Sequence, residues 1–434
     1  MDRPAQSSRS CRRARVAARV AALAAAVLLS VPLVPWTPGL LVVPAASPFV
    51  GVASAVATRS VGAAALIAVP LLVIACLRAR WFCRWACPVG LVSETLGRAR
   101  RASTPRLARW PAVGQWIVLA TLGGACLGYP VLLWTDPLAI LSGFLGAWRW
   151  PLTAASVLAA MGLPAVLVVS LIVPHAWCGR LCPLGGMQDL LAVPWRLARE
   201  RFRRRRTAPG ASSRGPVPAL ARRALLGLGV GAAGTLAVRL VRGAEPPLRP
   251  PGAADEDRFG GLCVRCGNCV RACPTGILRP DLGGSGVAGL LTPVVAFESG
   301  YCREDCRACG EVCPSGAIAR LSLEAKRRRV IGRARVTLSA CLLAGGQECT
   351  SCLVACPFEA IVRVRSTVAS APYDCPHVDV TKCNGCGACE AACPTAPPRA
   401  MRVFPVAARE RGGTPQAAVR MPAGAGNRTG RSGG

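Results

Sequence analysis

Four cysteine runs in the C-terminal half follow one spacing pattern, and this pattern restricts the chain more than any other feature. The last three cysteines of each run follow C-x2-C-x3-C-P, and the gap before them is two, three, seven and two residues in turn. The runs are Cys263, Cys266, Cys269 and Cys273; Cys302, Cys306, Cys309 and Cys313; Cys341, Cys349, Cys352 and Cys356; and Cys383, Cys386, Cys389 and Cys393.

This spacing is typical of iron–sulfur ligation. Three closely spaced cysteines wrap one cubane, and the cysteine beside proline ligates the other cluster of a pair. Zinc ribbons use C-x2-C without the closing Cys-Pro, and a disulfide framework has no reason to repeat one spacing four times. We therefore expect four [4Fe–4S] clusters. Paired runs therefore exchange their last cysteines. This predicts that Cys273 ligates the second cluster, Cys313 the first, Cys356 the fourth and Cys393 the third.

The first half of the chain has the composition of a membrane protein. Hydrophobic residues make up 52% of the sequence and the mean hydropathy is positive. A membrane-spanning helix needs about 20 apolar residues. The apolar blocks predict five spans, near residues 16–34, 61–77, 114–134, 156–173 and 224–241. Two shorter apolar blocks, residues 40–57 and 138–148, are expected to be interfacial or re-entrant.

The arginines predict the orientation of these spans. The chain has a net charge of +32, and its basic residues concentrate before the first span, between spans two and three, and between spans four and five. This alternation is the positive-inside pattern, so the N-terminus is expected in the cytoplasm and the C-terminal half on the other side of the membrane. Basic blocks beside spans set topology more often than they bind nucleic acid, and we expect no nucleic-acid partner.

The membrane half contains an internal duplication. The segments 32–37 and 130–135 share a P-x3-W-T motif, and each half ends in a C-x3-C-P pair. These pairs are Cys83 with Cys87 and Cys178 with Cys182. Matching halves are expected to bring all four thiols together at the cytoplasmic face. Two interpretations stay open: a further metal centre, or redox-active or structural thiols without metal.

Composition divides the chain into four parts. Residues 1–195 form the duplicated membrane domain, and residues 196–245 form a basic linker followed by a signal-anchor span with Arg222 and Arg223, similar to a twin-arginine export signal. Residues 255–405 form the four-cluster polyferredoxin domain, and residues 406–434 a disordered tail. The expected fold is a membrane α-helical bundle followed by an α+β polyferredoxin domain made of two ferredoxin-like two-cluster modules.

The sequence lacks the residues that other redox cofactors require. The sequence contains no C-x-x-C-H motif for c-type haem attachment. Its two histidines, His175 and His377, lie in different halves, so a bis-histidine haem within the bundle has no ligand pair. Neither a dinucleotide fingerprint nor a P-loop occurs in the sequence. Electron transfer through iron–sulfur clusters is the chemistry that the sequence supports.

Together, these motifs resemble two known families. The four-span core with its C-x3-C-P pairs is similar to the membrane ferredoxin-type subunit of periplasmic nitrate reductase systems. The twin arginine and the four runs, including the long first gap at Cys341, resemble the exported four-cluster ferredoxin-type subunit that partners it and a protein of methylamine dehydrogenase maturation. The chain departs from the membrane family after the second C-x3-C-P pair, where a linker and a span replace a cytoplasmic two-cluster ferredoxin.

The resemblance implies a multi-pass protein of the bacterial inner membrane with its ferredoxin domain on the periplasmic side. It implies electron transfer from the quinol pool to an extracytoplasmic oxidoreductase, so the expected partners are membrane lipid, quinone and a periplasmic redox protein. Whether this chain itself oxidises quinol, as part of a quinol dehydrogenase, stays open. The main alternative is a maturation factor that supplies electrons for assembling a periplasmic enzyme. A redox sensor is disfavoured, because no sensory or DNA-binding segment is visible.

Overall fold

The computed structural model describes residues 3–30, 39–99, 111–147, 153–207, 217–240, 246–365, 374–395 and 398–406. It contains two compact units, Met1–Arg327 and Arg328–Gly434. The first unit joins the helical half to the first two cysteine runs, and the second holds the last two runs. The boundary expected near residue 255 is therefore not a boundary between compact units. The division falls instead between the two ferredoxin-type modules.

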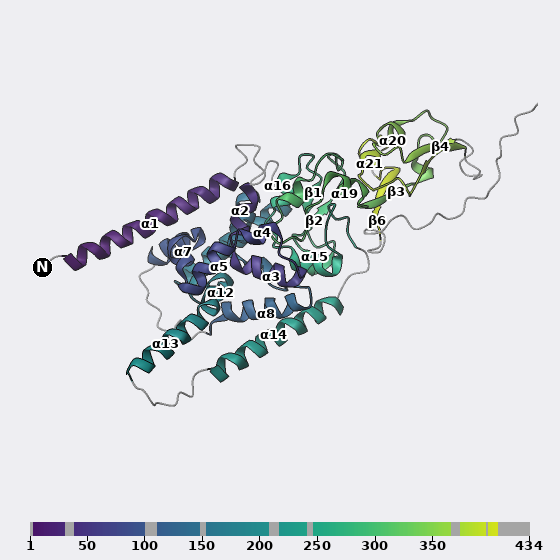
Figure 1. The fold of residues 1–434 in the computed structure, drawn as a ribbon. Helices are drawn as coiled ribbons and strands as arrows, with labels where there is room; N and C mark the ends of the chain where they lie inside the picture. The colour runs from purple at the N-terminus through teal and green to yellow at the C-terminus, as the bar shows by residue number, and fades with distance from the viewer. Residues whose placement is uncertain are drawn as a thin grey trace, which may run out of the picture. The chain divides into compact units, whose positions relative to one another are not determined.

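The helical part of the first unit consists of many short helices (Figure 1). They are α1 (Arg3–Ser30), α2 (Gly39–Ala45), α3 (Pro48–Thr58), α4 (Ala63–Leu66), α5 (Val69–Leu77), α6 (Trp81–Trp85), α7 (Pro88–Ala99), α8 (Val113–Cys126), η2 (Leu133–Thr135), α9 (Pro137–Ala147), α10 (Ala154–Ala160), α11 (Gly162–Ile172), η3 (Trp177–Leu181), α12 (Pro183–Leu191), α13 (Val193–Thr207) and α14 (Val217–Leu240). The linker expected from residue 196 is thus helical up to Thr207. The first P-x3-W-T motif and the tail after residue 406 lie outside the described residues.

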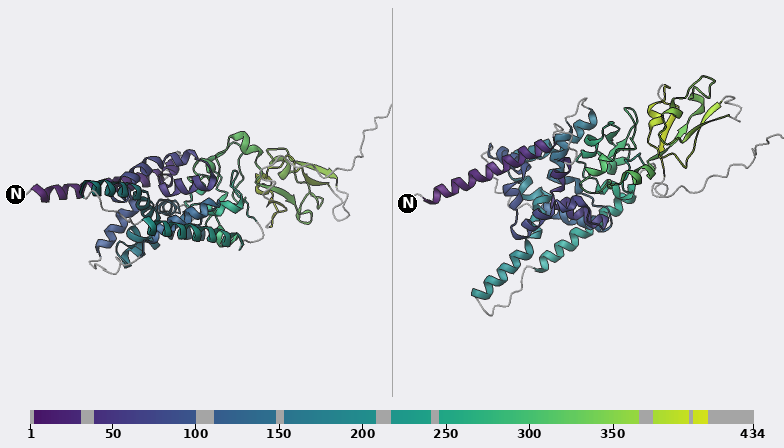
Figure 2. Two further views of the ribbon diagram at one scale, coloured as in Figure 1. Left: turned by 60° about the horizontal axis from the view of Figure 1, so that its bottom comes forward. Right: turned by 45° about the horizontal axis from the view of Figure 1, so that its top comes forward.

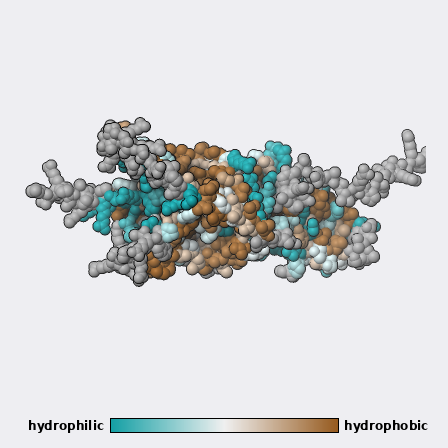
Figure 3. Space-filling model, turned by 90° about the horizontal axis from the view of Figure 1, so that it is seen from below, coloured by the Kyte–Doolittle hydropathy of each residue, from teal (hydrophilic) through white to brown (hydrophobic). Residues whose placement is uncertain are grey.

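Fewer helices are long enough to span a membrane than the five that we expected. By length and composition two described helical segments qualify, Ala154–Ile172 and Ala221–Leu240, or three if α2 and α3 count as one span bent by 90°. The expected spans at 61–77 and 114–134 are shorter helices, because the first breaks between α4 and α5 and the second ends at Cys126. Figure 3 shows hydrophobic side chains covering much of the surface of the helical part.

Helix α14 packs closely against α8 along a stripe of small residues (Figures 1 and 2). Gly227, Gly231 and Thr235 are buried at intervals of four residues, which places them on one face of the helix. A Cβ atom at Gly231 would overlap the backbone of Ala120, and one at Gly227 would lie 2.6 Å from the Cβ of Leu119. Such small-xxx-small faces let helix backbones approach in membranes, where lipid supplies no hydrophobic drive.

The N-terminal cap of α3, in the bent pair of α2 and α3, is hydrogen-bonded to the N-terminal cap of α9. Ser47 caps α3 and Asp136 caps α9, where its carboxylate accepts hydrogen bonds of 3.0 Å from the backbone N–H groups of Leu138 and Ala139. Ser47 also donates a 2.5 Å hydrogen bond to Asp136. Both side chains are fully buried. A buried carboxylate is tolerated here because helix N-termini favour negative charge and three donors surround it.

The first ferredoxin-type module packs onto the helices. Its elements are α15 (Glu256–Leu262), α16 (Asn268–Ala272), β1 (Leu278–Pro280), α17 (Gly286–Gly289), β2 (Pro293–Val295), α18 (Ala308–Glu311) and α19 (Leu323–Arg328), with β1 and β2 antiparallel. Asn268 is fully buried and donates a 2.6 Å hydrogen bond to the carbonyl of Leu40 in α2. Arg271 donates to Ser142 in α9, at 2.8 Å. These polar contacts fix the first cysteine run against the two apolar segments expected to be re-entrant.

The second unit is a small α+β module with two antiparallel pairs of strands. Its elements are β3 (Gly332–Val336), η4 (Leu338–Ala340), α20 (Ser351–Val354), β4 (Ile361–Arg365), β5 (Asp374–Val378), α21 (Ala388–Ala391) and β6 (Met401–Pro405). β3 pairs with β6, and β4 pairs with β5. In the first pair Ala334 lies opposite Val403, and Val336 opposite Met401. Since side chains two residues apart share a face, these four residues form one apolar surface.

The glycine contact between α8 and α14 can be tested with a matched pair of substitutions. Gly231→Leu should force the two helices apart and destabilise the protein by at least about 2 kcal/mol, because a packed backbone cannot admit the side chain. Gly229→Leu should change stability by less than about 0.5 kcal/mol, since the space around Gly229 is open. Thermal unfolding in detergent micelles measures both. Equal losses in the two variants would show that α14 is held by something other than this face.

Candidate iron–sulfur and thiol sites

The second unit contains two cavities, and each is lined by four thiols drawn from both of its cysteine runs. The lining thiols of one are Cys341, Cys349, Cys352 and Cys393, which we call the third set. Those of the other are Cys356, Cys383, Cys386 and Cys389, which we call the fourth set. In each set the thiol beside proline comes from the other run. The structure thus brings these cysteines together in the exchanged groups that the spacing predicts.

The paired strands β3 and β6 cover both cavities of the second unit. Ala334 and Val403 line the fourth set, and Val336 and Met401 line the third. The strand alternation and register therefore place one apolar face over two thiol sets. Ile361, which the sequence places after the Cys-Pro of the third run, also lines the fourth set. Apolar cover of this kind limits water access, which tunes the potential of an iron–sulfur centre.

The thiols of the first module also fall into two exchanged groups. A first set consists of Cys263, Cys266, Cys269 and Cys313, which line one cavity. A second set consists of Cys273, Cys302, Cys306 and Cys309. Burial, together with the neighbouring thiols of Cys302, Cys306 and Cys273, raises the pKa of Cys309 to about 12. The first two runs therefore exchange their last cysteines as the last two runs do.

The chemistry of these sets suits an iron–sulfur cluster. Burial and the adjacent thiols of Cys341 and Cys349 raise the pKa of Cys352 to about 11, so this thiol by itself is protonated near neutral pH. A cationic centre deprotonates such thiols outright and offsets their mutual repulsion. Among the described residues, no three Cys, His, Asp or Glu side chains lie close enough to hold a single metal ion. A cubane does not require that closeness, since each of its four irons binds one thiolate.

A buried lysine accompanies the second set. Lys326 in α19 is 4% exposed, and its ammonium donates to the carbonyl of Arg303. Burial raises the pKa of Cys302, and the charge and hydrogen bond of Lys326 act in the opposite direction. In the sequence Lys326 looks like the start of a solvated basic run that ends at Arg329, and only burial distinguishes it. A cation at this position stabilises negative charge on the second set.

The four C-x3-C-P thiols converge within the helical part, although their pairs lie far apart in sequence. Burial raises the pKa of Cys83 to about 11, and the neighbouring Cys178 thiol also raises it. Burial likewise raises the pKa of Cys182, and so do the thiols of Cys83, Cys178 and Cys87. We call these four residues the helical set. The structure thus brings together the second group of thiols that the sequence singles out.

The two halves contribute matching parts to the helical set. Arg80 and His175 stand at equal positions, three residues before the first cysteine of each pair. Both have a left-handed backbone, with φ of 55° and 63° respectively. Gly90 and Gly185 also occupy equal positions. A Cβ at either glycine would lie 3.4 Å from the carbonyl of the first cysteine in its own half. The two halves thus have the same local geometry around their cysteine pairs.

Each half also donates a polar side chain to the other half's first cysteine. Gln188 of α12 donates a 3.1 Å hydrogen bond to the sulfur of Cys83. Ser93 of α7 lies at the equivalent position and contacts the sulfur of Cys178, also at 3.1 Å. Hydrogen bonds to sulfur stabilise the thiolate and raise the potential of a bound iron–sulfur centre. Spacing arguments missed both residues, although their equal distance from the C-x3-C-P pairs was a signal.

Two arginines lie beside the helical set, and each donates a hydrogen bond to the backbone carbonyl of one of its cysteines. Arg80 forms a salt bridge of 2.6 Å with Asp189 and donates to the carbonyl of Cys178, at 3.2 Å. Arg19 pairs with Glu94 and donates to the carbonyl of Cys83, at 2.8 Å. Each arginine is thus oriented by a carboxylate and bound to a cysteine carbonyl. The arginine blocks therefore contain, besides any topogenic role, two residues whose positive charge favours the thiolate form of Cys178.

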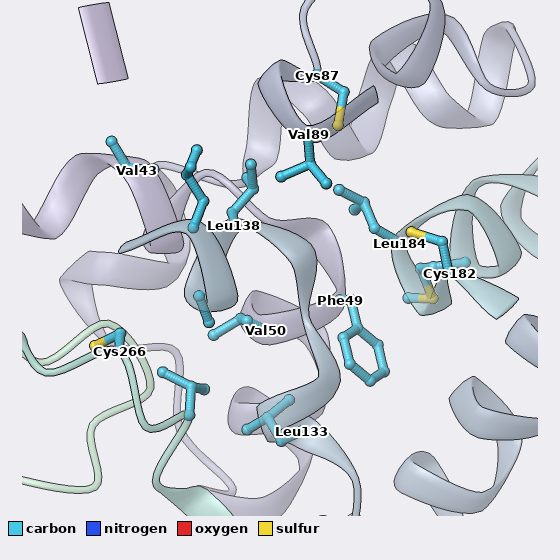
Figure 4. Close-up of a cluster of buried hydrophobic side chains, with 14 of the residues drawn as sticks. Val43, Phe49, Val50, Cys87, Val89, Leu133, Leu138, Cys182, Leu184 and Cys266 are labelled. Atoms are coloured by element: carbon cyan, nitrogen blue, oxygen red, sulfur yellow. The ribbon is translucent and has the colours of Figure 1, made fainter. Parts of the chain in front are cut away.

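A continuous apolar core joins the helical set to the first set. Cys87, Cys182 and Cys266 are each less than 9% exposed and belong to one cluster of buried side chains. Figure 4 shows Cys87 and Cys182 at one end of this cluster and Cys266 at the other, with residues such as Phe49 and Leu133 between them. The helices and the first module therefore share one core, and thiols from both the helical set and the first set lie in it.

Protein-family models match both kinds of site. The model described as a 4Fe-4S dicluster domain matches residues 262–317, and one described as a 4Fe-4S binding domain matches residues 376–399. A further 4Fe-4S binding domain matches twice, at residues 61–106 and 154–207. Its two matches include the C-x3-C-P pairs and thus the whole helical set. No solved structure matches the chain.

Several known proteins are similar to a part of the chain. The chain is 37% identical over 150 residues to the methylamine utilization ferredoxin-type protein MauM of Methylophilus methylotrophus, covering 34% of this chain and 66% of the relative. It is 36% identical over 185 residues to the ferredoxin-type protein NapG of Escherichia coli, covering 41% and 78%. It is 36% identical over 154 residues to the ferredoxin-type protein NapF of the same organism, covering 35% and 84%.

The exchanged thiol sets and the short strand pairs define an iron–sulfur protein of the ferredoxin type. More particularly, the chain belongs to the family of 4Fe-4S ferredoxin-type proteins that includes NapG, NapF and MauM of the Nap and Mau systems. The chain spans about two thirds of the length of the MauM relatives that it matches.

The lysine beside the second set should tune its potential. Lys326→Met should lower the reduction potential of the second centre, because a buried positive charge that stabilises the reduced state is lost. Arg327→Met removes the same charge from an exposed neighbour, where solvent and salt screen it, and should shift the potential much less. Anaerobic redox titration followed by electron paramagnetic resonance measures both. Equal shifts would mean that Lys326 acts only through net charge.

The hydrogen bond from Gln188 should be visible in the titration of Cys83. In cluster-free protein, Gln188→Met should raise the pKa of the Cys83 thiol by about one unit, since a hydrogen bond to a charged group is worth about 1.5–3 kcal/mol. The measurement is the pH dependence of alkylation at Cys83, followed by mass spectrometry. Gln115→Met replaces a glutamine of α8 outside the helical set and should leave the profile unchanged. An unaltered profile in Gln188→Met would contradict the contact.

Proposed function

We propose that this protein is a membrane-anchored iron–sulfur electron carrier that passes electrons from the quinol pool to an extracytoplasmic oxidoreductase. The sixteen cysteines of the four sets each ligate iron in four [4Fe–4S] clusters, which supply one-electron transfer. The chain joins, in one polypeptide, parts that resemble a membrane subunit and its exported ferredoxin partner. The support comes from its ferredoxin-type relatives, from the thiol sets and from the apolar helices.

The shared core between the helical set and the first set is the observation that carries this proposal. Cys87 and Cys182 lie in the same buried cluster as Cys266. A packed interior without water between two redox groups limits the reorganisation that accompanies each electron transfer, because few dipoles have to turn. Phe49, Val50 and Leu138 fill the space between the two ends (Figure 4). The helices thus provide a rigid medium as well as an anchor.

The exchanged ligands extend the route through the first module. Cys269 of the first set lies in α16, and Cys273 of the second set directly follows the same helix, four residues further on. The two sets are therefore held at a separation that backbone geometry determines. Arg19 and Arg80 stabilise negative charge at the helical set, and Lys326 does so at the second set. Positive groups at both places favour acceptance of an electron.

For the topology we propose that the N-terminus and the helical set lie at the cytoplasmic face and both ferredoxin-type modules in the periplasm. The arginine-rich segments support this orientation through the positive-inside rule. Export of the modules as folded domains would follow from the twin arginine at Arg222 and Arg223. The partners are then membrane lipid, the quinone pool and a periplasmic redox protein. The helical set either holds a further metal centre or acts as thiols alone.

Cluster content and electron entry test the proposal. The purified protein should contain about 16 iron atoms for the four sets, since each cubane holds four, and more if the helical set binds a centre. Cys87→Ser, Cys182→Ser and the quadruple variant of the helical set should each abolish quinol-dependent reduction of the four clusters, because members of one unit are non-additive. Reduction by dithionite should persist in all of them.

Cys126→Ser serves as the control, because Cys126 is exposed and belongs to none of the sets. It should keep both quinol-dependent and dithionite reduction. Quinol-dependent reduction that survives in the quadruple variant would exclude the helical set as an obligatory carrier. An iron content near eight, or zinc in place of iron, would contradict the four-cluster assignment.

A maturation role is the second candidate, and the similarity to the methylamine utilization proteins favours it. In that role the same electrons would reach an enzyme during its assembly and not during its turnover. Depletion of the protein after the target enzyme has matured separates the two functions. Loss of enzyme activity at once indicates a respiratory carrier, whereas loss only in newly made enzyme indicates a maturation factor.

A further inference from the structure

A large cavity adjoins the first set and extends well beyond it. It lies between the first set, the end of α9 and the beginning of α10, all within the first unit. The space open to a small molecule is about 720 Å³, which is within the ~300–1,000 Å³ of typical ligand pockets. Most of the lining is apolar, including Ala155 and Ala159 of α10 and Leu278 of β1.

The two cavities of the second unit provide an internal comparison. Each is lined by one thiol set, as this cavity is, yet their volumes are about 10 and 20 Å³ against about 720 Å³ here. A cubane of the same size in each set would therefore leave most of this cavity free. The additional space is bounded by helices of the first unit and not by the ferredoxin-type module alone.

Two arginines in the wall are donors that the fold holds in place. Arg271 donates hydrogen bonds to Ser142, at 2.8 Å, and to the carbonyl of Ser30, at 3.2 Å. A Cβ at Gly146 would lie 2.7 Å from the guanidinium of Arg271. The lack of a side chain at this position of α9 therefore leaves room for the arginine. The Arg265 guanidinium stacks over Trp134 at 5.1 Å. Among the described lining residues there is no carboxylate, so the site favours a ligand with oxygen acceptors.

The wall formed by α10 connects the cavity to the apolar surface. α10 and α11 together form the most hydrophobic candidate span, with a mean hydropathy of 2.3. Ala155 and Ala159 face the cavity, whereas Val157 and Leu158 of the same helix are 51% and 41% exposed. One face of α10 thus lines the cavity, and another face of the same helix belongs to the exposed apolar surface.

We propose that this cavity is the binding site for the quinol, with its ring beside the first set and its isoprenoid tail along α10 toward lipid. The inference rests on the proposed function and places its substrate. A lipid-soluble hydroquinone has the apolar body, the oxygen atoms and the redox chemistry that the walls and the adjacent thiols require. Its oxidation to quinone releases two protons, which pass to water at the cavity mouth, and two electrons, which are taken up one at a time by the centres on the core that the first set and the helical set share.

This placement gives quinol a site on the first module's side of the core, and it makes the helical set a second point on the same core. A quinol site at the first set and a quinol site at the helical set predict different results in photolabelling with a quinone analogue. A quinol site at the first set should be occupied in the variants of the helical set. A quinol site at the helical set should not respond to changes in α10.

Binding is tested with the full chain in phospholipid nanodiscs, using an azido-substituted ubiquinone with a short isoprenoid tail as photolabel. The label should attach to α10 or to residues 263–271, as located by mass spectrometry. Ala159→Trp fills the cavity and should reduce this labelling at least tenfold. Val157→Trp places the same side chain on the exposed face of α10 and should change it less than twofold. An unaltered iron–sulfur spectrum after dithionite shows that each variant is folded.

If Ala159→Trp fails to fold, Ala155→Leu narrows the same cavity with a smaller side chain and should reduce labelling at least threefold. Labelling that is confined to the helical set, or is equal in Ala159→Trp and Val157→Trp, would overturn the placement. Labelling that phospholipid competes away but unlabelled ubiquinol does not would also overturn it and assign the cavity to acyl chains. Failure of the proposed function has another signature: labelling in the cavity as described, without quinol-dependent reduction of the clusters.

Discussion

Burial of thiols in groups of four is the interaction on which the rest of the chain depends. Four thiolates cannot share a dry cavity by themselves, because desolvation and mutual repulsion both favour the protonated form. The raised pKa values of Cys83, Cys309 and Cys352 express this. Iron supplies the compensating charge when a cluster is assembled. The donors and cations around the sets, such as Gln188 and Lys326, supply a smaller part of it permanently.

The close union of the first module with the helices has a functional consequence. Buried polar contacts from Asn268 and Arg271 attach the first cysteine run to α2 and α9. Removing one partner of a buried hydrogen bond destabilises a protein by about 1–3 kcal/mol. These contacts therefore resist separation of the module from the helices. The first set therefore keeps a constant position relative to the helical set. Electron transfer benefits from that rigidity, since its rate depends steeply on the separation of the centres.

The matched halves explain how distant segments of sequence build one site. Gln188 and Ser93 each reach across to a cysteine of the other half, and two arginines occupy corresponding places beside the cysteine carbonyls. Neither half alone completes its surroundings, so the helical set exists only when both halves are folded together. Such mutual completion ties the integrity of the thiol group to the packing of the helices.

The sequence by itself determined the exchanged groups of cysteines and the positions of the C-x3-C-P pairs, because ligand spacing is a local property of the chain. The tertiary structure decided how the chain divides, since the contacts of Asn268 and Arg271 that join residues 255–327 to the helices link distant segments. It also decided which apolar blocks form long helices, and it turned Lys326 from one of several basic residues into a buried neighbour of Cys302. Burial and contact between distant segments carry no periodic signal, and this is why these features appear only in the folded protein.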